Sequence, residues 1–353
     1  MKILISSLSK TSLLYCLLFF SNHLASAQVN SKETLRKEFI QLIDRPKTAL
    51  NPFVKIDSSS DLITEKGYIY SESTEKVPFL IYKQKVKSTE KRPVVICLHG
   101  TGGTKEGMKN ILAKFSSLGF IAIAIDARFH GERRENVVGK TQYIQAIVKA
   151  WQSKDLENPT FPLYYDTVYD LSQLTEYLKT RNDVDPQRIG MMGISMGGIE
   201  AWLAASINPD IKVTVPIISV QSFKWSLEHD RWKGRVGSIQ EAHDQVVKDL
   251  HQQEVNKSNI ALFWNKLIPG ISDRFDCPSM LPLIAPRPLL VLNTENDPNC
   301  PLPGAEIAIR AAQKEYKRLK QEDKFKADIA PKELHTFVDY QAEMMYAFFK
   351  KWL

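Results

Sequence analysis

Cysteine is scarce in this chain, with four in 353 residues, which excludes a small domain stapled by disulfides. Cys16 falls in an apolar leader, and Cys97 sits in the apolar run Val94–Leu98, where we expect a small buried side chain. The three cysteines beyond the leader are an odd number and specify no disulfide framework. Cys277 and Cys300 remain a possible pair in an oxidising compartment.

The sequence also lacks an apolar run long enough to cross a membrane, which takes about 20 residues. The apolar run of the leader, Leu13–Phe20, is soon interrupted by Ser21-Asn22-His23, so an uncleaved anchor is disfavoured. A basic start precedes this run and Ala25-Ser26-Ala27 follows it, an order typical of a cleaved export signal. We therefore expect residues 1–27 to be removed after Ala27, leaving a secreted or periplasmic protein without a membrane span.

No segment is dominated by charge of one sign. Basic residues number 47 against 40 acidic ones, and removal of Lys2 and Lys10 with the leader leaves 45 against 40. Because these charges are interspersed, we interpret them as solvated surface and expect no nucleic-acid partner. The six histidines beyond the leader show no metal-site spacing, so neither a metal nor another cofactor is expected.

What the chain does have is alternation of short apolar runs with helical patterns. We expect strands at residues 64–71, 77–83, 93–98, 120–126, 189–192, 213–218 and 288–292, and helices at 105–118, 165–179, 198–205, 305–320 and 340–352. The first two strands are expected to pair antiparallel, and Pro216 is awkward for a central strand. Strand-helix alternation predicts an α/β fold, with a mostly parallel sheet and helices on both faces.

No linker divides the chain after the leader, so we predict a single domain over residues 28–353, with an N-terminal extension over about 28–60. Two segments, about 132–162 and 221–278, do not fit the alternation. We interpret both as helical cap insertions at the carboxyl ends of strands, the edge at which open α/β sheets bind ligands.

The segment Gly193-Ile194-Ser195-Met196-Gly197-Gly198 lies between a predicted strand and a predicted helix. G-x-S-x-G on such a turn is typical of a nucleophile elbow, which holds the serine hydroxyl above the sheet. The glycines are needed because a Cβ at Gly193 or Gly197 would clash in so tight a turn. The following helix N-terminus would stabilise developing negative charge. The alternative is a glycine-rich turn with an incidental serine.

The loop His99-Gly100-Thr101-Gly102-Gly103 ends another predicted strand and has the pattern of an oxyanion loop. We expect the backbone N–H groups of Thr101 and Met196 to converge on the oxygen of a substrate carbonyl. His99 is expected to hold this loop rather than to act as a base. A flexible glycine loop is the alternative interpretation.

His335 is the candidate general base, because it alone among the histidines follows the last predicted strand. The chain order nucleophile, acid, histidine is typical of this arrangement. The acid is expected in the loop after residues 288–292, where a carboxylate would hold the imidazole tautomer. Asp297, directly before Pro298, is our choice, and Glu295 remains the alternative.

Four motifs carry a resemblance to a known family: His99–Gly103, Asp126–Arg133, Gly193–Gly198 and Ala285–Leu290. From Pro93 to Leu353 the chain resembles the α/β-hydrolase superfamily, whose sheet is of an eight-stranded type. The nearest branch is the dienelactone hydrolase and acetyl xylan esterase-like group, which adjoins the prolyl oligopeptidases. The resemblance implies Ser195, Asp297 and His335 as a triad, with Thr101 and Met196 as oxyanion donors.

This chain departs from each neighbouring group in one respect. Dienelactone hydrolases carry a cysteine nucleophile where this chain has Ser195. Prolyl oligopeptidases carry a β-propeller before the catalytic domain, and residues 28–90 are too few for one. Glucuronoyl esterases typically place an arginine after the nucleophile, where this chain has Met196.

The predicted function is a serine carboxylic-ester hydrolase acting on a carbohydrate or similar small ester. Arg128 near the ligand edge is a candidate for binding an acidic sugar, although structural ion pairs that tie the loop to the fold are the favoured explanation for this residue. Trp225, Trp232 and Trp264 of the longer insertion are candidates for stacking on sugar rings, or else cap core. A peptidase or amidase, and a binding protein without catalysis, are the alternative functions.

Overall fold

The computed structural model describes residues 31–58, 61–86, 90–134, 140–155 and 157–353. The chain divides into two compact units, Met1–Leu42 and Ile43–Leu353. A helix runs over residues 31–43. All elements discussed below belong to the second unit, and the leader predicted at residues 1–27 lies outside the described residues.

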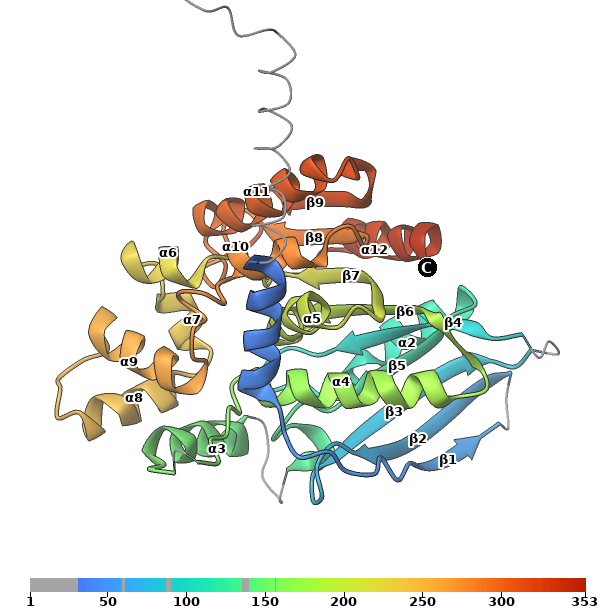
Figure 1. The fold of residues 1–353 in the computed structure, drawn as a ribbon, viewed down its shortest axis with the longest axis horizontal. Coiled ribbons are helices and arrows are strands. Elements are labelled where there is room, and N and C mark those ends of the chain that lie inside the picture. The colour runs from blue at the N-terminus through green and yellow to red at the C-terminus, as the bar shows by residue number, and fades with distance from the viewer. Residues whose placement is uncertain (1–30, 59–60, 87–89, 135–139, 156) are drawn as a thin grey trace, which may run out of the picture. The chain divides into compact units, whose positions relative to one another are not determined.

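The second unit is built on a nine-stranded sheet with the strand order β1-β2-β3-β5-β4-β6-β7-β8-β9 (Figure 1). Its strands are β1 Phe53–Asp57, β2 Leu62–Tyr70, β3 Lys76–Gln84, β4 Arg92–Leu98, β5 Ile121–Ile125, β6 Val184–Ile194, β7 Ile211–Ile217, β8 Leu289–Thr294 and β9 Phe325–Ala330. The pairs β1–β2, β2–β3 and β3–β5 are antiparallel, and all other neighbouring strands pair parallel. The predicted α/β class is confirmed, and the expected eight-stranded sheet is corrected to nine strands.

The sequence pattern predicted neither β1 nor β9, the two edge strands of the sheet. In β1, which lies inside the predicted N-terminal extension, Phe53 and Ile56 are exposed, and β9 is only partly buried. A strand at the sheet edge lacks the continuous apolar run that marks strands buried on both faces. The two strands therefore have weak local patterns.

Helices cover both faces of the sheet. They are α2 Lys109–Ser117, α4 Tyr165–Thr180, α5 Met196–Ile207, α11 Leu302–Arg318 and α12 Asp339–Trp352. Successive residues of a strand face opposite sides. On one side of β6, a Cβ added at Gly190 would lie 2.6 Å from the Phe349 ring of α12, and on the other, a Cβ at Gly193 would lie 2.1 Å from the Gly197 oxygen of α5.

The apolar core under α2 and α12 is centred on aromatic rings. The ring of Phe115 meets that of Phe349 at a centroid distance of 5.2 Å and that of Tyr346 at 4.9 Å, both edge-on. Phe115 and Phe349 are completely buried. Full burial of such a side chain contributes about 1.5–3 kcal/mol, so this cluster anchors the helix that follows His335.

Pro216 lies inside β7, although proline is unusual in a central strand. Its missing N–H falls in the ladder between β7 and β8. The N–H of Thr214 donates to Pro288 O and that of Ile218 to Leu292 O, with Pro216 midway between them. The strand survives because the proline removes one ladder bond while those on either side remain.

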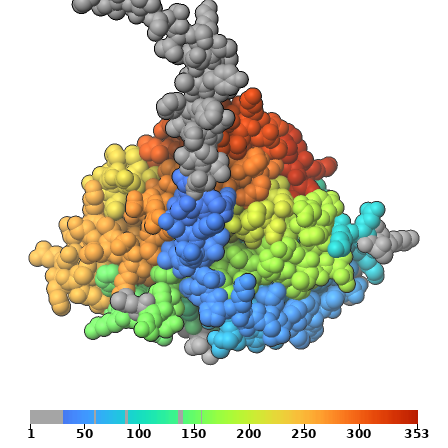
Figure 2. Space-filling view, viewed as in Figure 1, coloured from blue at the N-terminus to red at the C-terminus, as the bar shows by residue number. Residues whose placement is uncertain are grey.

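Both predicted insertions are helical and follow β5 and β7, at the carboxyl ends of parallel strands. They contain α3 Thr141–Gln152, α6 Phe223–Glu228, α7 Lys233–Gly237, α8 Gln240–Asp249 and α9 Lys257–Leu267. Helix α3 packs against α8 and α9, so the two insertions form one cap beside the strand ends (Figure 1). The green and orange segments of this cap adjoin at the molecular surface (Figure 2).

Asp276 ties the two ends of the longer insertion together. Its Oδ2 accepts a hydrogen bond from Ser222 Oγ at 2.5 Å, and its Oδ1 accepts from the N–H groups of Phe223 and Cys277, both at 2.8 Å. Burial raises the pKa of Asp276 to about 6, against the effect of these donors. The buried carboxyl group thus joins the start and the end of the longer insertion by hydrogen bonds.

The possible disulfide between Cys277 and Cys300 does not form. Both residues and Cys97 are free and buried. Cys277 starts the short helix α10 (Cys277–Met280), whereas the Cys300 thiol lies 3.3 Å from Ile218 O, its hydrogen-bond acceptor. Among the described helices, none is long and apolar enough to span a bilayer.

Candidate active site

Ser195 stands on the turn between β6 and α5 with a φ of 54°, a conformation that non-glycine residues rarely adopt. The turn closes because its glycines let backbones meet: a Cβ at Gly197 would lie 2.7 Å from His99 O. The N–H of Ser195 donates to Ile217 O at 2.9 Å and pins the turn to β7. The local strain is therefore supported by the neighbouring strands.

The side chains of Ser195, His335 and Asp297 form one chain of hydrogen bonds. The Nε2 atom of His335 lies 2.7 Å from Ser195 Oγ, and its Nδ1 atom lies 2.7 Å from Asp297 Oδ2. The Asp297 carboxylate is fully enclosed, whereas the imidazole is partly open to solvent. With Nδ1 protonated toward the carboxylate, Nε2 is free to accept the proton of the Ser195 hydroxyl.

The loop after β8 orients Asp297 by its own backbone. Asp297 Oδ1 accepts from the N–H groups of Asn299 at 2.7 Å and Cys300 at 3.1 Å, which leaves Oδ2 directed at His335. The alternative acid, Glu295, is exposed and accepts from the N–H of Lys332 at 2.7 Å. The structure brings Asp297, and not Glu295, to the imidazole.

Thr101 lies at the expected edge of the site. It lines the same pocket as Ser195, while the neighbouring Gly197 N–H donates to His99 O at 3.1 Å and holds the loop against the elbow. Met196 is the first residue of α5, so its N–H has no acceptor within the helix. These are the two backbone positions expected to donate to an oxyanion.

Two buried histidines hold the loop that contains Thr101. The Nε2 atom of His99 accepts from the N–H of Ala127 at 3.2 Å, and that of His130 accepts from the N–H of Gly102 at 3.1 Å. Both rings must be neutral to accept in this way. Burial lowers the pKa of His99 to about 4 and that of His130 to about 3, which keeps both neutral at neutral pH.

Asp126 at the end of β5 joins the same loops through a buried ion pair. Its carboxylate accepts from the backbone N–H of Lys105 at 2.8 Å and from the Lys105 ammonium at 2.7 Å. A Cβ at Gly131 would lie 2.0 Å from this carboxylate, and φ at Gly131 is +54°. Both the space and the backbone conformation therefore require glycine in the D-A-R-F-H-G segment.

A pocket of about 610 Å³ opens over Ser195 and His335. Its other walls are Gly100, Thr101, Lys140, Ile194, Ile218, Ser238, Asn299, Thr336 and Phe337. Lys140 and Ser238 come from the two insertions, and the Lys140 ammonium donates to Ser238 O at 3.1 Å. Neither residue belongs to a sequence motif, so only its place in an insertion associates it with this edge of the sheet.

Arg128 does not line this pocket. It is buried in an ion-pair network, donating to both oxygens of Asp170 at 2.8 Å and also contacting Glu72. Arg133 donates to the same Asp170 at 2.7 Å and to Glu75 at 2.9 Å. The network ties the loop after β5 to α4 and to the turn between β2 and β3, which is a structural role rather than a substrate-binding one.

The tryptophans of the longer insertion lie away from Ser195. Trp225 stacks on His229 at a centroid distance of 4.4 Å, and Trp232 is buried, its indole donating to Asp230 at 3.3 Å. Trp264 is buried edge-on against Phe223 in the cap core. None of them is among the residues that line the Ser195 pocket.

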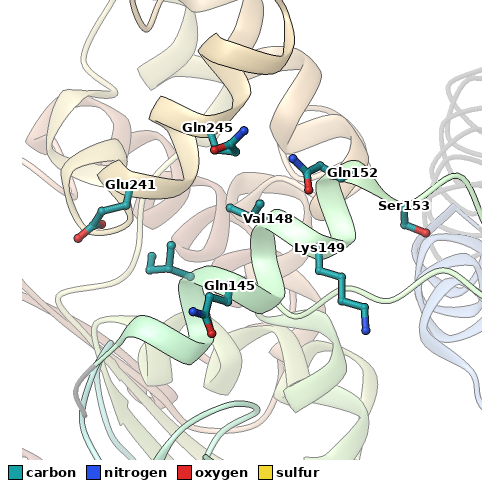
Figure 3. A pocket seen from close by; sticks show the side chains of 8 residues that line it. Gln145, Val148, Lys149, Gln152, Ser153, Glu241 and Gln245 are labelled. Atoms are coloured by element: carbon teal, nitrogen blue, oxygen red, sulfur yellow. The ribbon is translucent and has the colours of Figure 1, made fainter. Parts of the chain in front are cut away.

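The cap also carries a hollow of about 620 Å³ between α3 and α8, lined mainly by amide and charged side chains (Figure 3). Gln152 and Gln245 in its wall both donate to Asp249, at 2.9 and 2.7 Å. No histidine is among its lining residues. In the described ranges, no three His, Cys, Asp or Glu side chains gather in a way that could hold a metal ion.

Two protein-family models match the chain. Residues 68–227 match the model of acetyl xylan esterase (AXE1), and residues 162–353, more than half of the chain, match that of the prolyl oligopeptidase family. The chain belongs to the prolyl oligopeptidase family. Residues 53–84 of this family member contribute strands β1, β2 and β3 to the sheet that also carries Ser195.

Two relatives of the chain are named as a hydrolase and an esterase. The putative hydrolase YtaP of Bacillus subtilis is 25% identical over 269 residues, covering 72% of this chain and 76% of that protein. The putative esterase YitV of the same organism is 24% identical, covering 57% and 79%. The predicted enzyme class is confirmed. This family member is a hydrolase that is related to carboxylic ester hydrolases.

Solved structures show the same fold at low sequence identity. The acetyl xylan esterase from Paenibacillus sp. R4 aligns with a TM-score of 0.63 and 18% identity, over 92% of this chain and 93% of that one. A glucuronoyl esterase from Solibacter usitatus aligns with a TM-score of 0.60 and 14% identity, over 89% and 91%. The predicted α/β-hydrolase fold is confirmed.

Proposed function

We propose that this chain is a serine carboxylic-ester hydrolase in which Ser195, His335 and Asp297 act as a catalytic triad. The observation that carries the proposal is the unbroken chain of two 2.7 Å hydrogen bonds from the Ser195 hydroxyl through the imidazole to the carboxylate. Its setting on a strained strand-to-helix turn, beside a glycine-rich loop, supports the assignment.

In the proposed reaction, Ser195 Oγ attacks the acyl carbon while His335 Nε2 takes its proton. The negative carbonyl oxygen accepts hydrogen bonds from the N–H groups of Thr101 and Met196. The C–O bond to the alcohol then breaks, and the alcohol leaves with the proton from His335. Water repeats the sequence on the acyl-enzyme, releasing the acid and restoring the Ser195 hydroxyl.

The proposed substrate is an acyl ester of a carbohydrate or a similar small alcohol. Esterases among the relatives and the open pocket beside the cap support this class. Substrate contact was predicted for Arg128, Trp225 and Trp232; the proposal assigns it instead to side chains that line the Ser195 pocket, among them Lys140, Asn299 and Phe337.

Labelling by a fluorophosphonate probe and turnover of p-nitrophenyl acetate test the proposed chemistry. Ser195→Ala is expected to lose the label and to lower kcat by about 10⁴-fold or more, because the nucleophile is absent. Asp297→Asn is expected to lower kcat by about 10⁴-fold through the wrong imidazole tautomer, with Glu295→Gln as the matched control near wild type. Wild-type turnover in Ser195→Ala refutes the proposal.

Membership of the prolyl oligopeptidase family supports a second candidate, a peptidase or amidase. An amide demands protonation of a poorer leaving group than an alkoxide. Turnover of an N-acylaminoacyl p-nitroanilide that is lost in Ser195→Ala selects the amidase, and turnover of the matching p-nitrophenyl ester without any turnover of the anilide selects the esterase.

We also propose that the protein is exported through cleavage after Ala27. The order of basic start, apolar run and Ala25-Ser26-Ala27 supports this. Intact mass of the protein from its native host is expected to correspond to a chain beginning at Gln28, and a chain retaining Met1 contradicts export by this route.

A further inference from the structure

The cap helix α7 lies directly against the loop that carries Asp297. A Cβ added at Gly234 would stand 2.2 Å from Pro298 O and 2.7 Å from Asn299 Oδ1. Real Cβ atoms essentially never approach backbone so closely. The cap backbone and the acid loop are therefore packed without space for any side chain between them.

Arg235, the next residue of α7, adds polar contacts to the same loop. Its Nη2 atom donates to Asn299 O at 3.0 Å and lies 3.3 Å from Cys300 Sγ. The side chain is buried, with 5% of the residue exposed. Burial alone would lower the pKa of Arg235, but neighbouring Tyr164 and other groups, Asp297 among them, hold it above its ordinary value, so the guanidinium stays charged.

These contacts act on the two residues that orient the acid. The N–H groups of Asn299 and Cys300 are the donors to Asp297 Oδ1, and the peptide oxygen that Arg235 binds belongs to Asn299. Any displacement of residues 299–300 therefore rotates the carboxylate that faces His335. The Asn299 oxygen that Arg235 binds and the Cys300 N–H that donates to Asp297 belong to the same rigid peptide plane. We therefore expect the positions of Arg235 and the Asp297 carboxylate to be tightly coupled.

We propose that Arg235 is a positioning residue for the proposed triad, through which the cap braces the acid loop from outside the sheet. The inference rests on the proposed function and extends it: the longer insertion does more than shape the pocket, because it supplies the contact that aims Asp297 at His335. Arg235 does not line the pocket, whereas Asn299 does. Loss of this brace therefore acts first on imidazole orientation and only through Asn299 on substrate contact.

The test compares Arg235→Met and Arg235→Lys with Arg231→Met, an exposed arginine of the same insertion. Misplacement of a catalytic group by about 1 Å costs about 10²-fold, so we expect Arg235→Met to lower kcat by about 10–100-fold, with any rise in KM smaller than the fall in kcat. Arg235→Lys retains the charge without the planar guanidinium group, so its kcat is expected to lie between those of Arg235→Met and wild type. The kcat of Arg231→Met is expected to match wild type.

The pH profile separates positioning from general stability. A carboxylate that faces the imidazole less well stabilises the imidazolium less, so the acid limb of kcat/KM moves to lower pH in Gly234→Ala, which displaces the loop but leaves the Arg235 charge in place. Arg235→Lys also keeps a positive charge and is expected to show a smaller shift in the same direction. Wild-type kcat in folded Arg235→Met, or an unmoved acid limb in folded Gly234→Ala, overturns the inference. Failure of the proposed function is distinct, since it appears as unchanged turnover in Ser195→Ala.

Discussion

Gly197→Ala tests whether the elbow and the loop containing Thr101 must touch. The new Cβ would lie 2.7 Å from His99 O and 2.7 Å from the Leu98 carbonyl carbon, whereas ordinary contact begins at 3.4 Å. Backbone atoms of the loop would therefore have to retreat by about 0.7 Å, the difference between these distances. Because φ at Gly197 is not positive, the effect is one of space alone.

The retreat would carry the Thr101 N–H away from the position proposed for the oxyanion. Loss of one oxyanion donor costs about 10²–10³ in kcat, or about 2.7–4 kcal/mol, so we expect Gly197→Ala to lower kcat by about 10²-fold with little change in KM. Overpacking costs about 1–3 kcal/mol of stability, which thermal unfolding followed by circular dichroism measures.

Gly107→Ala is the matched control, because a Cβ there meets nothing within 4 Å. It is expected to retain wild-type kcat and Tm. Loss of one oxyanion donor would lower kcat by about 10²–10³-fold. A folded Gly197→Ala protein whose kcat stays within about twofold of wild type, well short of that loss, would refute the reasoning that the close contact holds the loop in place.

Three further predictions concern stability and redox state. The pKa of His130 is lowered to about 3 from 6.5, so its neutral form stabilises the fold fully above about pH 6.5, and this contribution is lost as pH falls toward 3; urea unfolding between pH 4 and 7 is expected to show a shallower pH slope for His130→Gln than for wild type, and equal slopes would contradict it. Phe349→Ala empties a completely buried site and is expected to lower the free energy of unfolding by about 3–5 kcal/mol, with a loss below about 1 kcal/mol counting against the packing described. A chromogenic thiol reagent is expected to titrate three thiols in the denatured mature chain and almost none in the native one, since Cys97, Cys277 and Cys300 are free and buried; one thiol on denaturation without reductant would indicate a disulfide.

Features determined by neighbours in sequence were predictable from the sequence. The turn at Ser195 needs small residues within two positions on either side, and Gly193 and Gly197 supply them in the chain itself. The central strands were recognisable because both their faces are buried, which leaves a continuous apolar run. The edge strands β1 and β9 were not, because neither has a continuous run of buried residues and their pairing comes from residues elsewhere in the sheet.

The amino-acid sequence by itself therefore determined the class of fold, the elbow serine, the histidine that follows it and the loop in which the carboxylate lies. Only the tertiary structure decided which carboxylate reaches His335, that Arg128 closes an ion-pair network, and that α7 rests on the acid loop. The physical reason is distance along the chain. Arg235 and Asn299 lie 64 positions apart, and a contact at that separation leaves no pattern in either segment.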